Sequence, residues 1–260
     1  MNVSVKYVAP TFNLRPGPSL KRIWLLLAIV AIACFALVSQ RWADRTVVTH
    51  SFGSAARVDG DSAPSRRQPP ESPGFEGCPG DGDGGDRVLN RLKNRVDSAE
   101  WAPTPIASIL ALDWPPLIVR REREEWSRSE RRAVVQKEGL PIAIEGYFVG
   151  AKTEGPEATN CHGAESKFRD WHIWLAPIPG KDRRRSIIVE TTPAIRSQHP
   201  DWKLNDIHRL VRDSVLVRVS GWLLFDQDHP EQVGKTRGTL WEIHPVMKIE
   251  AMRKGHWEPL

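Results

Sequence analysis

The feature that most constrains this chain is a two-residue period of apolar side chains, which recurs in several segments between Leu140 and Glu250. Alternation of this kind is typical of β-strands with one buried face. Turn residues separate five such segments, at 141–151, 170–176, 186–192, 214–225 and 239–249. Residues 200–212 instead carry apolar side chains at helical spacing. The sequence therefore predicts three strands, a helix and two strands, in that order.

This order resembles the five-stranded OB-fold barrel, and Gly146 and Gly150 stand where a strongly coiled first strand would bend. The segments VRVSGWLLFD at 217–226 and LWEIHPVMKIE at 240–250 are similar to those of uncharacterised exported bacterial proteins with OB-like domains. The resemblance implies a fold and no particular activity, because OB barrels serve many ligands. We predict a mainly β protein with accessory helices, whose OB-like barrel (β-β-β-α-β-β) occupies residues 140–250 and precedes a tail at 251–260.

The N-terminal region contains one apolar segment, at residues 23–40, whose first sixteen residues read IWLLLAIVAIACFALV. Its length just reaches the roughly 18–20 residues that a membrane-spanning helix needs. Basic residues and no acidic ones precede it, so the positive-inside rule places residues 1–22 in the cytoplasm and the rest outside the inner or cytoplasmic membrane. The alternative is a lipoprotein lipidated at Cys34, since VAIAC resembles a lipobox. Both alternatives tether the chain to the same membrane face.

Between this anchor and the barrel, the sequence predicts a linker and then short helices. Residues 41–85 are rich in Pro, Gly, Ser and charge, which is typical of a disordered linker. Asp86 is a good N-cap for a helix that ends near Ser98, and Ser127 with Glu130 has the spacing of a capping box. The first helix has an apolar stripe, so we expect residues 86–139 to pack on the barrel.

Charge and cysteine content leave two questions open. The net charge of +5 suits an anionic partner, but basic and acidic residues are interspersed, which favours solvated ion pairs over a phosphate-binding track. Cys78 and Cys161 form a disulfide if the domain is exported, or else remain two free thiols. The distance between the two cysteines in the fold decides between these alternatives, and the sequence alone does not give that distance.

Residue parity along the strands predicts two faces for the barrel wall. The interior face receives Ile144, Ile173, Leu175, Ile187, Val189, Val215, Val217, Val219 and Ile243. The opposite face receives Glu145, Tyr147, His172, Trp174, Glu190, Thr192, Arg218, Ser220, Trp222, Glu242 and His244. Tryptophans on an outer face predict that something covers them, either the helices of 86–139 or a ligand.

The leading functional hypothesis is a binding or interaction module rather than an enzyme, with no required cofactor. Aromatic stacking and hydrogen bonding would hold a protein, glycan or nucleic-acid ligand on the barrel. The candidate ligand-binding residues are Trp174, Trp222, Trp241, His172, Glu190, Arg218, Glu242 and His244. The N-terminal helix adds the membrane as a further partner.

The alternative hypothesis is a metal-dependent hydrolase or nuclease that uses a His/Asp/Glu cluster on the barrel. Neither HExxH nor GxSxG is present, so no motif names a reaction. Cysteine, histidine and carboxylate side chains are the usual ligands of Zn²⁺. The predicted zinc ligands are Cys161, His162, Asp170 and His172, which a short loop would bring together.

Overall fold

The structure is a computed structural model that describes residues 72–260. The predicted cytoplasmic segment, the membrane helix at 23–40, the alternative at Cys34 and the first part of the linker lie outside the described residues. No helix within residues 72–260 is long and apolar enough to cross a membrane.

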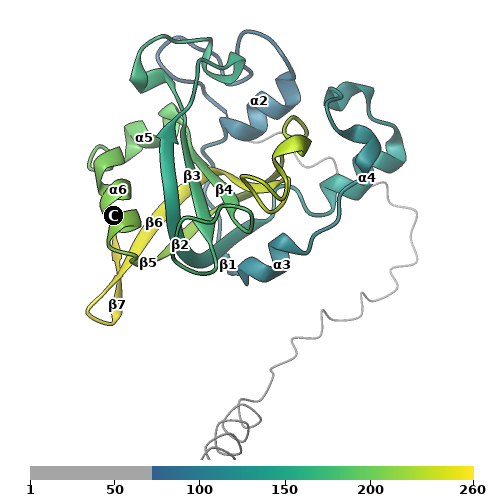
Figure 1. The fold of residues 1–260 in the computed structure, drawn as a ribbon. Helices are drawn as coiled ribbons and strands as arrows, with labels where there is room; N and C mark the ends of the chain where they lie inside the picture. Colours follow the sequence, from purple (N-terminus) through teal and green to yellow (C-terminus); the bar gives the residue numbers. More distant parts are fainter. Residues whose placement is uncertain (1–71) are drawn as a thin grey trace, which may run out of the picture. The chain divides into compact units, whose positions relative to one another are not determined.

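Five strands form a closed barrel, as the sequence predicts (Figure 1). They are β2 (Pro141–Thr153), β3 (Trp171–Ala176), β4 (Ile187–Thr191), β5 (Leu216–Phe225) and β6 (Trp241–Arg253). Strands β2, β3 and β4 pair antiparallel in sequence order, and β4 then pairs parallel with β6. Antiparallel pairing of β6 with β5, and of β5 with β2, closes the barrel.

Two short strands extend the sheet beyond the barrel. Strand β1 (Ala102–Pro103) pairs parallel with β2, and β7 (His256–Pro259) pairs antiparallel with β6. The residues predicted to form a tail, 251–260, therefore continue β6 and turn back as a hairpin. The prediction of a tail is wrong here because the turn at Lys254 and Gly255 lets the chain pair with its own preceding strand.

The barrel core confirms the predicted interior face. All nine residues assigned to it belong to the main apolar cluster or pack against it, and all except Val215 are fully buried. Gly146, which the sequence predicts to be a point where the first strand bends, allows a close approach of two strands in the structure. A Cβ at this position would lie 2.6 Å from the carbonyl oxygen of Ala176, so β2 can come this close to β3 only with a glycine here.

Two helices connect β4 to β5. Helix α5 (Pro193–Gln198) begins at Thr192, whose side chain accepts from the Ile195 N–H, and helix α6 (Leu204–Arg212) packs against β2. The sequence predicts α6 but not α5. The stripe of α6 that contains Ile207 and Leu210 is buried against the barrel, which accounts for its helical spacing of apolar residues.

The segment before the barrel forms short helices, as predicted. They are α2 (Arg87–Lys93), α3 (Ile106–Leu110) and α4 (Arg128–Val135), with 3₁₀ turns at Pro116–Ile118 and Arg123–Glu125. Asp86 caps α2 by accepting from the Leu89 N–H, and Ser127 and Glu130 form the capping box of α4. Further 3₁₀ turns at Ala158–Asn160, Ser166–Phe168 and Pro230–Gln232 lie in the connections between strands.

Residues 72–85 differ from the predicted linker because they are fixed to the barrel. A disulfide joins Cys78 to Cys161 in the connection between β2 and β3, which decides the question of pairing. The side chain of Asn94, at the end of α2, donates to the Thr159 carbonyl at 2.8 Å. The Thr159 hydroxyl donates to Asn90 at 2.7 Å. These contacts bind α2 and the preceding turns to the β2–β3 connection (Figure 1).

Candidate functional site

A charged pocket of about 150 Å³ opens where α2, the β2–β3 connection and the β5–β6 loop meet the barrel wall. Most of its lining side chains are ionisable. They are Lys93, Lys152, Glu154, Glu157, His172, Trp174, Glu190, Asp226, His229, Gln232 and Glu242. The five carboxylates in this set outnumber the two lysines, but Asp226 and Glu242 are paired with the buried Arg237, so the acidic excess is small. A small acidic excess favours a cationic or neutral occupant.

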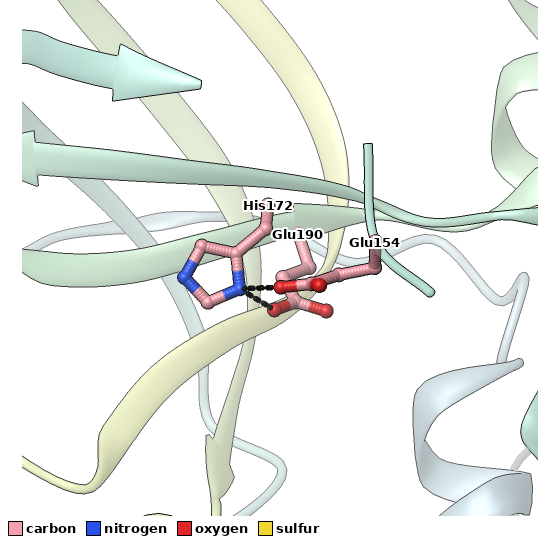
Figure 2. Close-up of side chains that lie close together, drawn as sticks. All are labelled: Glu154, His172 and Glu190. Carbon is pink, nitrogen blue, oxygen red and sulfur yellow. Dashed lines mark ion pairs between the residues drawn. The ribbon is translucent and has the colours of Figure 1, made fainter. Parts of the chain in front are cut away.

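His172 lies at the centre of the pocket wall, beside two carboxylates (Figure 2). Its Nδ1 atom is 2.7 Å from Oε1 of Glu154 and 2.7 Å from Oε1 of Glu190. Glu190 is the cross-strand partner of His172 in the β3–β4 ladder, and Glu154 directly follows β2. Three neighbouring strands thus bring the three side chains together.

The opposite charges of His172 and Glu154 stabilise each other's ionised forms. Burial lowers the pKa of His172, but the hydrogen bonds to Glu154 and Glu190 outweigh it and raise that pKa to about 9. Burial raises the pKa of Glu154, but the hydrogen bonds from His172 and Lys152 outweigh it and lower that pKa to about 2. At neutral pH the ring is therefore an imidazolium held beside two carboxylates.

A second histidine, His244, lies deeper, behind the pocket. Its side chain is fully buried, and its ring nitrogens face Asp170 at 3.5 Å, Glu190 at 3.5 Å and Glu242 at 3.3 Å. Burial lowers the pKa of His244, but the surrounding carboxylates of Asp170, Glu242 and Glu190 outweigh it and raise that pKa to about 10. Glu190 contacts both histidines, so the two layers are electrostatically connected.

Arg237, from the β5–β6 loop, forms a third buried group of charges beside the pocket. Its guanidinium is 1% exposed, and it donates to Asp226, to Glu242 at 3.0 Å and to the Thr239 carbonyl at 2.8 Å. Burial raises the pKa of Asp226, but the charge of Arg237 and the hydrogen bond from His229 hold it well below its usual range. This group fixes the loop to the end of the barrel.

Some polar atoms at the pocket have no hydrogen-bond partner among residues 72–260. They include Nε2 of His172 and the indole nitrogen of Trp174 on the pocket wall, and Nε2 of His244 behind it. The residues are nonetheless buried, with His172 8% and Trp174 6% exposed. Unpartnered buried polar atoms are uncommon in folded proteins, and their concentration here distinguishes the pocket from the rest of the barrel.

The structure brings together part of the predicted ligand-binding set. His172, Trp174, Glu190 and Glu242 line the pocket, and His244 supports it from behind. Arg218 lies elsewhere, beside the open hollow of about 530 Å³ that Trp101 and Lys248 also line, and it pairs with Glu250 at 2.8 Å. The charges in that hollow are largely satisfied by one another.

Two of the predicted tryptophans do not reach any ligand surface. Trp222 is covered by the segment that follows α2: the Arg95 guanidinium stacks on its ring at 3.4 Å, and its indole N–H donates to the Asp97 carbonyl at 3.2 Å. Trp241 is fully buried in the core and donates to the Asp113 carbonyl at 3.2 Å. The accessory segment therefore supplies the cover that the two tryptophans require.

The zinc ligands predicted from sequence do not form one site. Cys161 is in the disulfide, and a disulfide sulfur is not a thiolate ligand. His162 is an exposed residue that pairs with Asp83 at 3.4 Å, while Asp170 faces His244. Two other groups of three metal-ligating side chains converge among the described residues: Glu154, His172 and Glu190, and Asp170, Glu190 and His244.

Sequence reasoning missed Glu154, Lys93 and Asp226 as pocket residues. Each lies at or beyond the end of its helix or strand, where parity gives no direction for the side chain. The sequence does contain a repeated pattern of an acidic residue two positions before a histidine, Asp170 with His172 and Glu242 with His244, but it indicates only residues that were already predicted and none of these three. Side chains two apart in a strand point to the same face.

Comparison of the sequence with known protein families and with curated protein sequences gives no match. The interpretation of the site therefore depends on its own geometry.

Proposed function

We propose that this protein is a membrane-anchored, extracytoplasmic binding module that takes a small cationic ligand into the pocket around His172. The observation that carries this proposal is the pocket itself, which is lined by five carboxylates and also by His172 and Trp174, whose buried nitrogens Nε2 and Nε1 have no partner among residues 72–260. The positive group of a ligand would balance the acidic charge, and acceptor atoms on the same ligand would satisfy these N–H groups.

The strand order supports our further proposal that the barrel is of the OB type. In an OB-fold the loops between strands 1 and 2 and between strands 4 and 5 bind the ligand. Here those loops correspond to the β2–β3 connection and the β5–β6 loop. Glu154 and Glu157 come from the first, and Asp226, His229 and Gln232 come from the second. The pocket thus lies where an OB barrel would hold a ligand.

The disulfide supports the proposed location outside the cytoplasm. Disulfides persist in oxidising compartments and are rare in the cytosol. The basic residues before residue 23 give the same orientation. Alkaline phosphatase, which is active only outside the cytoplasm, should therefore be active when fused after Leu260. A well-expressed but inactive fusion, with an active cytoplasmic reporter at the same position, would contradict this orientation.

The binding proposal is tested with the full-length chain in detergent by thermal shift and calorimetry. The ligands are small organic amines, divalent metal ions, nucleotides and neutral sugars. Cations should bind, and Glu190→Gln should weaken binding at least tenfold, because this residue contacts both histidines. The matched control is Glu100→Gln, an exposed residue remote from the pocket lining, which should bind as the wild type does. Pocket-dependent binding of nucleotides alone, or no binding of any cation, would overturn the proposal.

A second candidate function is a metal-dependent hydrolase or nuclease, favoured by the two converging groups of histidine and carboxylate side chains. It predicts that Zn²⁺ or Mn²⁺ will support hydrolysis of ester or phosphodiester reporter substrates, and that Glu190→Gln will abolish it. Metal binding without hydrolysis of any such substrate would leave the binding module as the function.

A further inference from the structure

We propose that Glu154, His172 and Glu190 hold one divalent transition-metal ion of the Zn²⁺ class, an inference that rests on the proposed function of the pocket. The metal ion would be the cationic occupant itself, or the group through which a further ligand is held.

Three donor atoms converge on one point. Nδ1 of His172 lies 2.7 Å from Oε1 of Glu154 and 2.7 Å from Oε1 of Glu190, and both carboxylates lie on the same side of the ring (Figure 2). A ring nitrogen carries at most one proton, so it can donate a normal hydrogen bond to only one of these oxygens at a time. A metal ion has several coordination positions and accepts all three donors together.

The second argument is the kind of donor. One imidazole nitrogen and two carboxylate oxygens are ligands that suit Zn²⁺ and related ions. In a tetrahedral site with bonds of about 2.0–2.2 Å, ligand atoms are roughly 3.2–3.5 Å apart. The three side chains would therefore separate by about half an ångström when the ion enters. The fourth position would face the pocket, which is the arrangement of zinc sites that bind water or a ligand.

The third argument is the support around the three donors. Lys152 donates to the second oxygen of Glu154 at 2.8 Å, and His244 lies 3.5 Å from the second oxygen of Glu190. Such outer contacts hold carboxylate ligands in orientation. The second converging group contains Asp170 and His244, which are fully buried and do not line the pocket. We therefore assign the ion to Glu154, His172 and Glu190, which do line it.

A fourth observation is the Nε2 atom of His172, which has no hydrogen-bond partner among residues 72–260 although the residue is only 8% exposed. Nδ1, by contrast, faces both carboxylates. A metal ion on Nδ1 would fix the ring in the tautomer that carries its proton on Nε2, and it would place a positive charge beside both carboxylates.

The test is calorimetric titration of the full-length, chelator-treated chain in detergent with ZnCl₂, followed by Co²⁺ absorption spectroscopy. One Zn²⁺ should bind per chain, and His172→Gln should weaken it at least tenfold and alter the visible Co²⁺ bands. The matched control is His162→Gln, which changes an exposed histidine that is not part of either converging group. Glu154→Gln gives a second variant for the case that His172→Gln does not fold, because Glu154 follows its strand.

The outcomes separate this inference from the proposed function. Equal Zn²⁺ affinity of wild type and the two pocket variants would overturn the metal site, as would no Zn²⁺ binding by the wild type. If an organic cation such as putrescine still bound in a Glu190-dependent manner, the binding module would survive without its metal. If neither Zn²⁺ nor an organic cation bound, both proposals would fail.

Discussion

Two groups of buried charges lie side by side at this end of the barrel, and they differ in how completely they are satisfied. Arg237 donates from all of its side-chain nitrogens, to Asp226, Glu242 and the Thr239 carbonyl. His172 presents one ring nitrogen to two carboxylates, and its other nitrogen has no partner among residues 72–260. Both side chains are almost fully buried.

This difference in hydrogen bonding separates two reasons why a charged side chain can be buried. A buried charge is tolerated when its hydrogen bonds are complete, and such a group needs nothing from outside. A buried charge with incomplete hydrogen bonds is a reason to look for a ligand. By this criterion the Arg237 group stabilises the fold, and we propose the His172 group as the binding site.

The largest expected effect is on stability, from Asp226→Asn. Removing this carboxylate leaves Arg237 buried with one partner fewer, which should lower the free energy of unfolding by about 3–5 kcal/mol. Glu154→Gln, in the His172 group, should cost only about 1 kcal/mol, because its side chain is partly exposed and Glu190 remains beside the ring. Urea unfolding of the full-length chain and its variants measures both. Equal losses would show that the two groups do not differ in structural role.

The next effect is a pH dependence of stability to which the His172 group contributes. The pKa of His172 is raised to about 9 from its ordinary value of 6.5. Its stabilising contribution is therefore complete below about pH 6.5 and is lost as the pH rises through about 9, by up to about 3 kcal/mol. Thermal or urea unfolding of the metal-free chain between pH 6 and pH 10 measures this loss.

In the variant His172→Gln, that slope of stability with pH should become shallower, while the exposed His162→Gln should keep the wild-type slope. Arg237 remains charged throughout this range, so its guanidinium adds no slope. The pKa values of His229, which contacts Asp226, and of His244 are also raised, so both histidines retain part of the slope in this variant. A wild-type slope in His172→Gln would mean that another group, such as His244, dominates.

The smallest effect extends the same comparison to two tryptophans. The Trp222 indole N–H donates to the Asp97 carbonyl, whereas the Trp174 indole N–H has no partner among the described residues. Replacement by Phe removes the N–H from each, so Trp222→Phe should be more destabilising than Trp174→Phe by about 1 kcal/mol. Conversely, only Trp174→Phe should change ligand binding in the pocket. Equal destabilisation by the two variants would contradict the structural distinction between them.

Local patterns in the sequence were sufficient for most of the fold. Alternation assigned Ile144, Ile173 and Val219 to the barrel interior, and the caps at Asp86 and Ser127 marked where α2 and α4 begin. Strand alternation and helix caps depend on residues that are close together in the chain, so they can be predicted from the sequence. Parity also places Trp241 with Ile243 on the interior face, which should have excluded it from the ligand-binding set.

The candidate site was harder to predict from the sequence than the fold, because it depends on contacts between residues that are distant in the chain. Parity placed His172 and Glu190 on one face, but only the register of β3 against β4 makes them cross-strand partners. Glu154 lies beyond its strand, so no period indicates its direction. Cys161 and His162, two of the predicted zinc ligands, are adjacent in sequence. The disulfide takes the first and a left-handed turn directs the second to solvent.

The disulfide also determines how a mechanical force would pass through the domain. Cys78 stands six residues after the first described residue, Ser72, and it is joined covalently to Cys161. Tension applied between Ser72 and the C-terminus would cross the sulfur bridge and continue from Cys161 onward. Residues 79–160 form a closed loop outside this path, and they include α2, β2 and the pocket residues Lys93, Glu154 and Glu157. While the bridge is intact, stretching of the chain therefore cannot extend the backbone of this wall of the pocket.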